Sequence, residues 1–262
     1  MIIKEFCAEN TTLLSQLDSS VKRVELCDNL AVGGTTPSYG VIKEAARYLH
    51  EKEISLATMI RPRGGNFVYN DSELRIMEDD ILRAAELESD NLVLGLLTED
   101  NHIDIEGIEQ LLPSTQGLPL VFHMAFDQIP LANQKEAIDQ LVDLGFVRIL
   151  THGSSENNDI FENVDHLKEL VDYADGRIEI MIGGGVTADN YQELIEKQVP
   201  KLHTELKSVN NPTALCDDKV LFFIPKNPNS SELGFSITFI LFLEISFSSK
   251  RRLLHVHLYE YG

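Results

Sequence analysis

The chain has 262 residues, of which 43% are hydrophobic and 24% charged, so it can build a packed core and wholesale disorder is excluded. Its 42 acidic residues outnumber 22 basic ones, a net charge of −20 that repels phosphate backbones and anionic lipid. We therefore expect no nucleic-acid partner and no membrane partner. Three scattered cysteines are too few for a disulfide framework, and the N-terminus turns acidic at Glu5 before a signal-peptide core forms. The expected location is cytoplasmic.

Short apolar runs alternate with amphipathic segments through the first 203 residues. The runs cover residues 2–6, 23–26, 56–60, 92–97, 118–122, 147–150 and 178–182, and helical patterns such as 136–144 and 164–173 lie between them. Spacings of roughly 20–35 residues are typical of βαβ units in a parallel sheet. An eighth strand is suggested at residues 201–203. We predict an α/β fold, a (β/α)8 TIM-like barrel with an atypical or missing eighth βα unit; an open doubly wound sheet is the alternative.

The composition changes near residue 204. Residues 204–262 contain six acidic and six basic residues, so the whole charge of −20 belongs to residues 1–203. We therefore predict a barrel over 1–203 and a divergent tail over 204–262. Within the tail, residues 235–247 are nearly all apolar but too few to span a bilayer. This segment is expected to pack on the barrel or to self-associate, with a membrane anchor as the alternative.

A Glu-x-Cys pattern recurs at the expected carboxyl ends of the first two strands, as Glu5-Phe6-Cys7 and Glu25-Leu26-Cys27. Residues two apart share a face of a strand, so two thiols in the barrel mouth place both carboxylates inward, one layer deeper. Neighbouring parallel strands lie about 5 Å apart, so both sulfurs could meet one small ion. Soft thiolates with few other ligands favour Cu(I). The alternatives are two small buried hydrophobic residues or a reversible disulfide.

Two arginines follow the third run, in the string Arg61-Pro62-Arg63-Gly64-Gly65. The proline restrains a turn, and the glycines permit unusual backbone angles. Arg61 and Arg63 are candidates to neutralise an inward carboxylate such as Glu25, or to bind an anionic ligand in a fork. An internal ion pair that holds the loops together is equally compatible with the pattern.

Histidines follow the fifth and sixth runs. His123 and Asp127 come after the run 118–122, where they could form an oriented acid–base pair or supply metal ligands. A single strand-end histidine is more often a core group than a ligand. His152 adds a second imidazole to the same rim.

A triple glycine, Gly183, Gly184 and Gly185, follows the seventh run and precedes an expected helix with Thr187 as its N-cap. Free backbone N–H groups at this position form the anion site of many (β/α)8 barrels. The alternative is a tight turn without a ligand.

These segments together resemble the CutC family, historically called copper homeostasis proteins. The matching stretches are Arg23–Cys27, Gly33–Ser38, Met59–Gly65, Leu97–Asp100, Phe122–Asp127, Arg148–Thr151 and Gly183–Val186. The resemblance covers about residues 1–203, and its specific strings are Arg-Pro-Arg-Gly-Gly and Gly-Gly-Thr-Thr-Pro-Ser. It implies a TIM-like barrel, a cytoplasmic location, a homo-oligomer and a Cu(I) site at Cys7 and Cys27.

The chain departs from the family pattern at three places. Met124 stands where the fifth-strand motif commonly carries Arg, and Ile182 stands where Pro usually precedes the triple glycine. Residues 202–204 read Leu-His-Thr where the family has His-Gly-Thr. The tail has no resemblance to the family, which leaves open a variant end, a fused segment or an altered reading frame. A missing eighth helix would leave one side of the barrel uncovered.

Three hypotheses follow. The first is a protein that buffers or delivers Cu(I) through Cys7 and Cys27, with His123 as a further ligand. The second is an enzyme acting on a small anionic or phosphorylated metabolite. In that enzyme the anion would bind Arg61, Arg63, His152, Gly183, Gly184 and Gly185, while Glu25, His123 and Asp127 would move protons. The third is a chain that folds poorly because its tail replaces the eighth unit.

Overall fold

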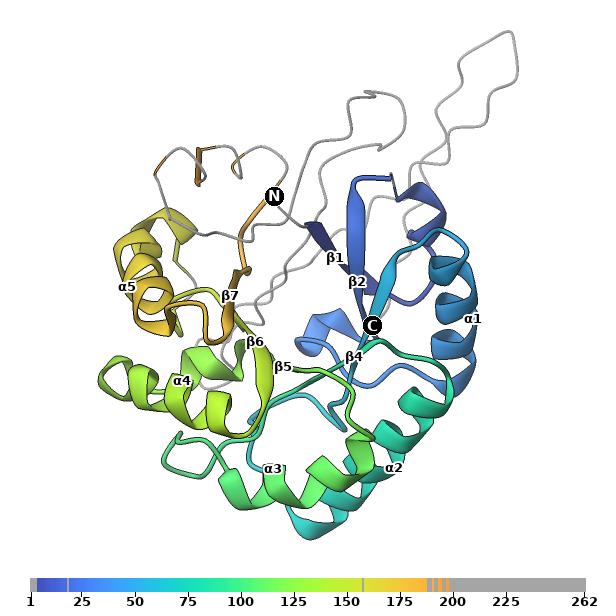
Figure 1. Ribbon diagram of the computed structural model, residues 1–262, viewed down its shortest axis with the longest axis horizontal. Helices are drawn as coiled ribbons and strands as arrows, with labels where there is room; N and C mark the ends of the chain where they lie inside the picture. Colours follow the sequence, from blue (N-terminus) through green and yellow to red (C-terminus); the bar gives the residue numbers. More distant parts are fainter. Residues whose placement is uncertain are drawn as a thin grey trace, which may run out of the picture. The chain divides into compact units, whose positions relative to one another are not determined.

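The computed structural model describes residues 4–17, 19–156 and 158–187, together with positions 190, 193, 194 and 197. In these residues seven strands form one parallel sheet, in sequential order from β1 to β7 (Figure 1). The strands are β1 (Lys4–Glu9), β2 (Val21–Cys27), β3 (Ser55–Met59), β4 (Asn91–Leu94), β5 (Leu120–Phe122), β6 (Phe146–Thr151) and β7 (Glu179–Ile182). Each of the seven predicted apolar runs therefore overlaps a strand.

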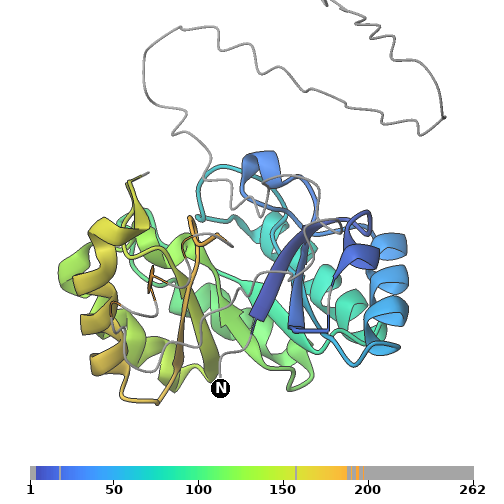
Figure 2. The same ribbon diagram turned by 90° about the horizontal axis from the view of Figure 1, so that it is seen from above.

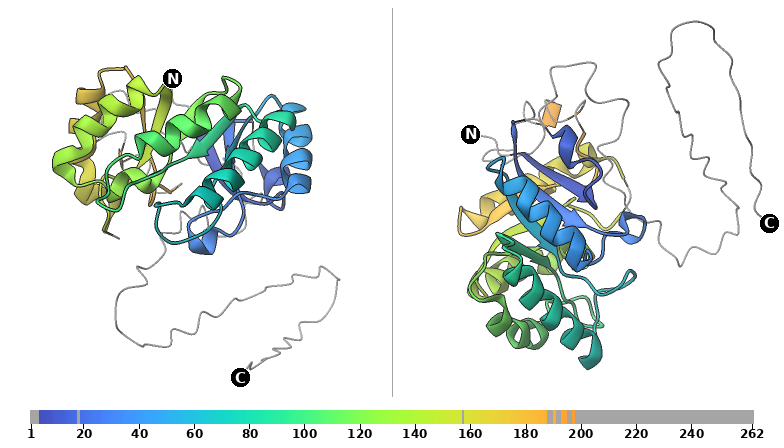
Figure 3. Two further views of the ribbon diagram at one scale, coloured as in Figure 1. Left: turned by 90° about the horizontal axis from the view of Figure 1, so that it is seen from below. Right: turned by 90° about the vertical axis from the view of Figure 1, so that its right-hand side faces the viewer.

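Helices connect successive strands and lie on the outer side of the curled sheet in each view (Figures 2 and 3). The described α-helices are α1 (Tyr39–His50), α2 (Asp71–Glu86), α3 (Ile105–Leu111), α4 (Gln134–Asp143) and α5 (Val164–Ala174). Short 3-10 helices lie between them: η1 (Leu14–Gln16), η2 (Leu30–Val32), η3 (Leu112–Thr115), η4 (Met124–Gln128), η5 (Leu131–Asn133) and η6 (Ile160–Asn163). Sequential parallel strands with helices on one side define the predicted α/β barrel class.

Successive side chains of strand β2 alternate between an apolar set that faces the helices and a polar set that faces the concave side of the sheet. In β2, Val24 and Leu26 are fully buried and pack with the apolar face of α1, which presents Ile42 and Leu49. Because successive strand residues point to opposite faces, the intervening Arg23, Glu25 and Cys27 point to the concave side of the sheet. The concave side of β2 is thus polar, while its helix-facing side is apolar.

Local signals in the sequence begin the helices that hold the strands in place. Ser38 accepts a hydrogen bond from the backbone N–H of Val41 at the start of α1. Asn70 and Glu73 form a reciprocal capping box at the start of α2, which satisfies backbone donors that the first helical turn leaves free. Both caps lie in the connections that follow strands, so they also fix the course of the loops above the sheet.

One sequence expectation is modified by the structure, and three lie outside the described residues. Strand β1 does not end at Cys7 but continues to Glu9, because Ala8 is buried in the α1 layer and the ladder with β2 extends to Glu9. The expected eighth strand at 201–203, the domain change at 204 and the apolar segment 235–247 all lie outside the described residues. Among the described residues, no helix is both long and apolar enough to cross a membrane.

Candidate functional site: a Cys-Glu-Cys cluster

The two Glu-x-Cys segments lie side by side, but the second is shifted by two residues along the ladder relative to the first. In the parallel ladder, Cys7 of β1 is opposite Glu25 of β2, and Cys27 is opposite Glu9. The expectation that both carboxylates lie one layer below both thiols is therefore wrong for Glu25, which is level with Cys7. Neighbouring strands of a barrel are staggered by the shear of the sheet, and a repeated motif does not reveal that stagger.

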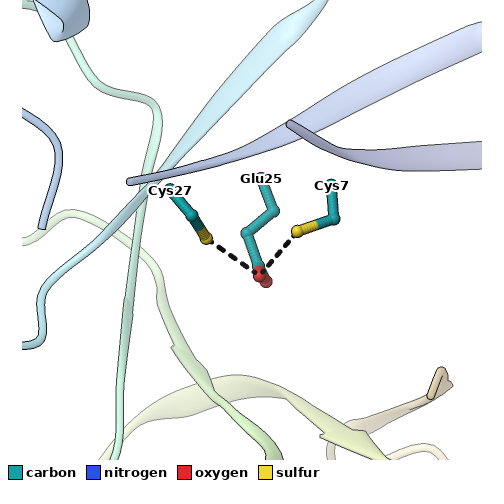
Figure 4. Close-up of side chains that lie close together, drawn as sticks. All are labelled: Cys7, Glu25 and Cys27. Carbon is teal, nitrogen blue, oxygen red and sulfur yellow. Dashed lines mark hydrogen bonds between the residues drawn. The ribbon is translucent and has the colours of Figure 1, made fainter. Parts of the chain in front are cut away.

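The stagger places the Glu25 carboxylate between the two thiols (Figure 4). Cys7 Sγ and Cys27 Sγ each donate a hydrogen bond to Glu25 Oε1, both at 3.6 Å. The ligand atoms of the three residues all lie within 4.8 Å of one another. Cys27 is fully buried, Glu25 is nearly so, and Cys7 is partly exposed. We call these three residues the Cys-Glu-Cys cluster.

Burial controls the protonation of the cluster. Desolvation, reinforced by the nearby charge of Glu5, raises the pKa of Glu25 to about 7. The contact with Cys7 and burial together raise the pKa of the Cys27 thiol well above its usual value. For Cys7, the contact with Cys27 lowers the pKa, but burial and Glu25 raise it by more. Both sulfurs are therefore thiols at neutral pH, and a metal ion that binds them as thiolates displaces protons.

The cluster has an apolar side and a charged side. Cys27 packs in one buried group with Ala57, Met59, Val93 and Val121 from β3, β4 and β5. This apolar lining excludes water from the Cys27 sulfur.

The charged side is a chain of four residues that sequence reasoning missed as a group. Arg23 Nε lies 2.7 Å from Glu5 Oε2, and Arg23 Nη2 lies 3.3 Å from Glu179 Oε1. Arg148 Nε lies 3.0 Å from Glu179 Oε2. The only sequence signal was alternation, which puts Arg23 and Arg148 on the inward face of otherwise apolar strands.

The donor set fits a soft metal ion. Two thiolates and a carboxylate are strong ligands, and the softness of sulfur favours Cu(I) or Zn²⁺ over hard cations. Two sulfurs bound to one such ion, each at about 2.3 Å, lie no more than about 4.6 Å apart, close to the spacing of this cluster. Glu25 Oε2 has no hydrogen-bond partner among the described residues, so the carboxylate has a free oxygen to offer. The Cys-Glu-Cys cluster could thus hold a metal ion.

The two predicted anion-binding arginines make hydrogen bonds to groups of the protein itself. Arg61 is buried and donates from Nη1 to Val32 O and Gly34 O, and from Nη2 to Gly65 O. Arg63 pairs with Glu73 of the α2 capping box and donates to carbonyls of its own loop. Arg63 and Glu73 form an internal ion pair, the alternative that the sequence left open. Anion binding by Arg61 and Arg63 stays a prediction.

His123 and Asp127 are both buried, but they are not paired with each other. His123 Nδ1 accepts from Ala125 N at 3.1 Å, and its Nε2 has no partner among the described residues. Burial, with the nearby Arg61 charge, lowers the pKa of His123 to about 3, so this ring is neutral. Asp127 instead accepts hydrogen bonds from the hydroxyl of Thr151 and from the backbone N–H groups of His152 and Gly153.

His152 lies against the triple glycine. A Cβ on Gly184 would be 3.4 Å from His152 Nδ1 and 2.7 Å from Met124 Cε, and Gly184 has φ +70°, so glycine is required there. His152 Nε2 is 3.0 Å from Asn158 Oδ1, and Nδ1 is buried without a partner in the described structure. Thr187 Oγ1 accepts from Asn190 N, as expected of an N-cap.

A curled parallel α/β sheet with two thiols and a carboxylate converging on its inner face defines an α/β barrel protein with a soft-ligand site. The model of the CutC family matches residues 2–208, and the chain belongs to this family. The predicted family membership is confirmed.

Known relatives agree with this membership. A CutC family protein of Streptococcus pyogenes serotype M6 is 71% identical over 194 residues, covering 74% of this chain and 93% of that protein. The human copper homeostasis protein cutC homolog is 43% identical over 176 residues, covering 66% of this chain and 61% of the homolog. A crystal structure of CutC from Streptococcus agalactiae, 70% identical, covers 78% of this chain and 97% of its own with a TM-score of 0.76. A phosphonopyruvate hydrolase structure, 11% identical, covers 78% of this chain and 74% of its own with a TM-score of 0.55, and shares the fold alone.

Proposed function

We propose that this protein binds Cu(I) through Cys7 and Cys27, and that it buffers or delivers copper in the cytoplasm. The observation that carries the proposal is the convergence of both thiols on Glu25 Oε1 from neighbouring strands. The scarcity of cysteines in the sequence supports the cytoplasmic location. The copper-related names of the relatives support the choice of metal.

The surroundings of the cluster favour a soft ion of low charge. Two thiolates and Cu(I) carry a net charge of −1, and a neutral Glu25 adds nothing to it. A buried site tolerates a net charge of −1 better than a larger net charge, because each uncompensated buried charge is costly. The apolar side chains beside Cys27 would keep water away from a metal bound to this sulfur. Glu25 would orient both thiols before the ion binds, and would then take part as a weaker oxygen ligand.

An anaerobic Cu(I) titration against a competing chelator tests the proposal. The variant with both Cys7→Ser and Cys27→Ser should lose at least about 100-fold in affinity, since even the loss of an outer partner of a ligand costs up to that much. Cys216→Ser, which removes the third cysteine of the chain, is the matched control and should bind as the wild type does. Equal affinities in the wild type and the double variant would reject the proposal.

The alternative, an enzyme for a small anionic metabolite, has one observation in its favour. The unpartnered Nδ1 of His152 lies beside Gly184, next to the predicted anion-binding glycines. Thermal-shift screening of phosphorylated and acidic compounds, repeated on His152→Ala, tests this reading. A stabilising compound that loses its effect in the variant would support it, and a screen without any such compound would count against it.

We also propose that the protein forms a homo-oligomer, as the family resemblance implies. Light scattering on the purified full chain measures the mass directly, and a monomeric mass would contradict this proposal.

A further inference from the structure

The loop that follows Cys27 folds back over its thiol. Residues 28–35, here called the Cys27 loop, leave β2 and return to it. Asp28 and Thr35 close the loop with two backbone hydrogen bonds of 2.9 and 2.7 Å. At the closing end, Gly34 lies so near the sulfur that an added Cβ would be 3.1 Å from Cys27 Sγ. Cys27 has no exposed surface as a result of this cover and the apolar lining.

Arg61 holds the Cys27 loop in this closed position from the neighbouring strand end. Its Nη1 donates to Val32 O at 2.9 Å and to Gly34 O at 2.8 Å, and its Nη2 donates to Gly65 O at 2.8 Å. Its backbone N–H also donates to Thr36 Oγ1, and its backbone carbonyl accepts from Thr36 N. The side chain of Arg61 therefore binds the loop itself, and its main chain binds Thr36, the residue that follows the loop.

The contacts require a guanidinium. Arg61 is 3% exposed, and the ring of Phe67 lies 4.8 Å from its Cζ. Its planar fork can donate to carbonyls of two loops at once, whereas the ammonium of lysine is a point charge that makes fewer directed bonds at this distance. Hydrogen bonds to a charged group are about twice as strong as neutral ones. Arg61 gives the loop two such bonds of 2.9 and 2.8 Å, and Glu9 Oε1 adds a longer one of 3.3 Å from Leu30 N.

We infer that Arg61 is a positioning residue that closes the Cys27 loop over the inner thiol, so that Cys27 reacts and exchanges metal only when this loop opens. The metal part rests on the proposed Cu(I) function, but the control of thiol access does not. Cys7 lies on β1 and is partly exposed while the loop is closed, so its access depends less on Arg61.

Thiol alkylation of the full-length, metal-free protein tests the inference. The reduced protein is treated with N-ethylmaleimide, and the modification of each cysteine is followed by peptide mass spectrometry. In the wild type, Cys27 should react more slowly than the partly exposed Cys7. Arg61→Gln should raise the alkylation rate of Cys27 at least about tenfold, because losing a charged hydrogen-bond donor shifts the loop toward its open state. The rate at Cys7 should stay within about twofold, as expected for a site outside that local opening.

Two further variants separate a local opening from general loss of structure. Arg63→Gln is the matched control, because Arg63 binds Glu73 and the carbonyls of Gly64, Asn66 and Val68, none of which lies in the Cys27 loop. It should leave the Cys27 rate unchanged. Arg61→Lys should give a Cys27 rate between those of the wild type and Arg61→Gln. Hydrogen exchange at Thr35 N–H, which bonds to Asp28 O, should rise in parallel with the Cys27 rate.

The outcomes distinguish this inference from the proposed function. An unchanged Cys27 rate in Arg61→Gln, or an equal rise in Arg63→Gln, would overturn the inference even if the two cysteines bind copper. A rise at Cys7 equal to that at Cys27 would also overturn it, since that reports global unfolding. In the copper-loaded protein, faster capture of Cu(I) by a chelator from Arg61→Gln would extend the inference to metal release. Failure of the cysteine titration would leave the alkylation result standing.

Discussion

At the scale of single residues, close approach of backbone to side chain explains why particular positions carry glycine. Gly95 follows β4, and a Cβ there would lie 2.5 Å from His123 Cε1 and 3.1 Å from Ala125 Cβ. His123 cannot retreat easily, because its ring is buried and packs against Phe67 at 5.0 Å between centroids. The neutral His123 thus serves first as a packed core group whose Nδ1 caps η4.

We predict that Gly95→Ala destabilises the protein by about 1–3 kcal/mol, the usual penalty for overfilling a packed core. Gly40→Ala is the matched control: Gly40 lies in α1 with nothing within 4 Å of an added Cβ, so alanine there should be neutral or stabilise by up to about 1 kcal/mol. Chemical denaturation of both variants measures the difference. Equal free energies of unfolding would show that the His123 ring moves aside at little cost.

At the scale of elements, a buried carboxylate joins η4 to the loop after β6. Asp127 Oδ1 accepts from the Thr151 hydroxyl at 2.5 Å, and its Oδ2 accepts from His152 N at 3.0 Å. These donors lower the pKa of Asp127, but burial outweighs them and raises it to about 6. The imidazole of His152 lies near this carboxyl and also acts to lower the pKa of Asp127.

The raised pKa predicts how stability depends on pH. Because the folded protein holds the Asp127 proton more tightly than the unfolded chain, this carboxyl favours folding below about pH 4 and loses that contribution as pH rises through about 6. The free energy of unfolding of Asp127→Asn, minus that of the wild type, should therefore increase by up to about 3 kcal/mol between pH 4 and pH 7.5.

Urea denaturation across this pH range measures the difference. His152 is present in both proteins. Asp100→Asn, at an exposed turn, controls for the loss of one negative charge. A difference between Asp127→Asn and the wild type that stays flat or falls with pH would contradict the expected direction.

At the scale of the whole sheet, buried ion pairs connect strands that are far apart in the sequence. Glu179 of β7 binds Arg23 of β2 and Arg148 of β6, while Arg23 also binds Glu5 of β1. The chain of charges crosses the inner side of the curled sheet and joins its first and last described strands. Removal of one partner of a buried pair leaves the other charge without compensation.

We predict that Glu179→Gln lowers the free energy of unfolding by about 3 kcal/mol, because Arg148 then keeps no carboxylate partner among the described residues. Glu86→Gln removes the exposed pair with Arg83 on α2 and should change stability by no more than about 0.5 kcal/mol. Thermal and chemical unfolding of the two variants test this contrast. Similar small effects would mean that the inner charge chain does not hold the sheet together.

Several parts of the fold and of the site follow from the amino-acid sequence by itself. Alternation of apolar runs and amphipathic segments predicted the order of strands and helices, because both periodicities are properties of the local chain. The two Glu-x-Cys segments predicted thiols on neighbouring strands. The specific strings predicted the family. These inferences hold because they depend on residues within one element or in consecutive elements.

Other features depend on how elements meet, and only the tertiary structure decided them. The stagger between β1 and β2 placed the Glu25 carboxylate between the two thiols, instead of one layer below both. The path of the Cys27 loop turned Arg61 toward two backbone carbonyls, although its residue type equally suits an anion. The pairing of Arg23 with Glu179 spans 156 positions. Local sequence carries periodicity and residue chemistry, whereas register, loop path and long-range pairing follow from packing across the whole sheet.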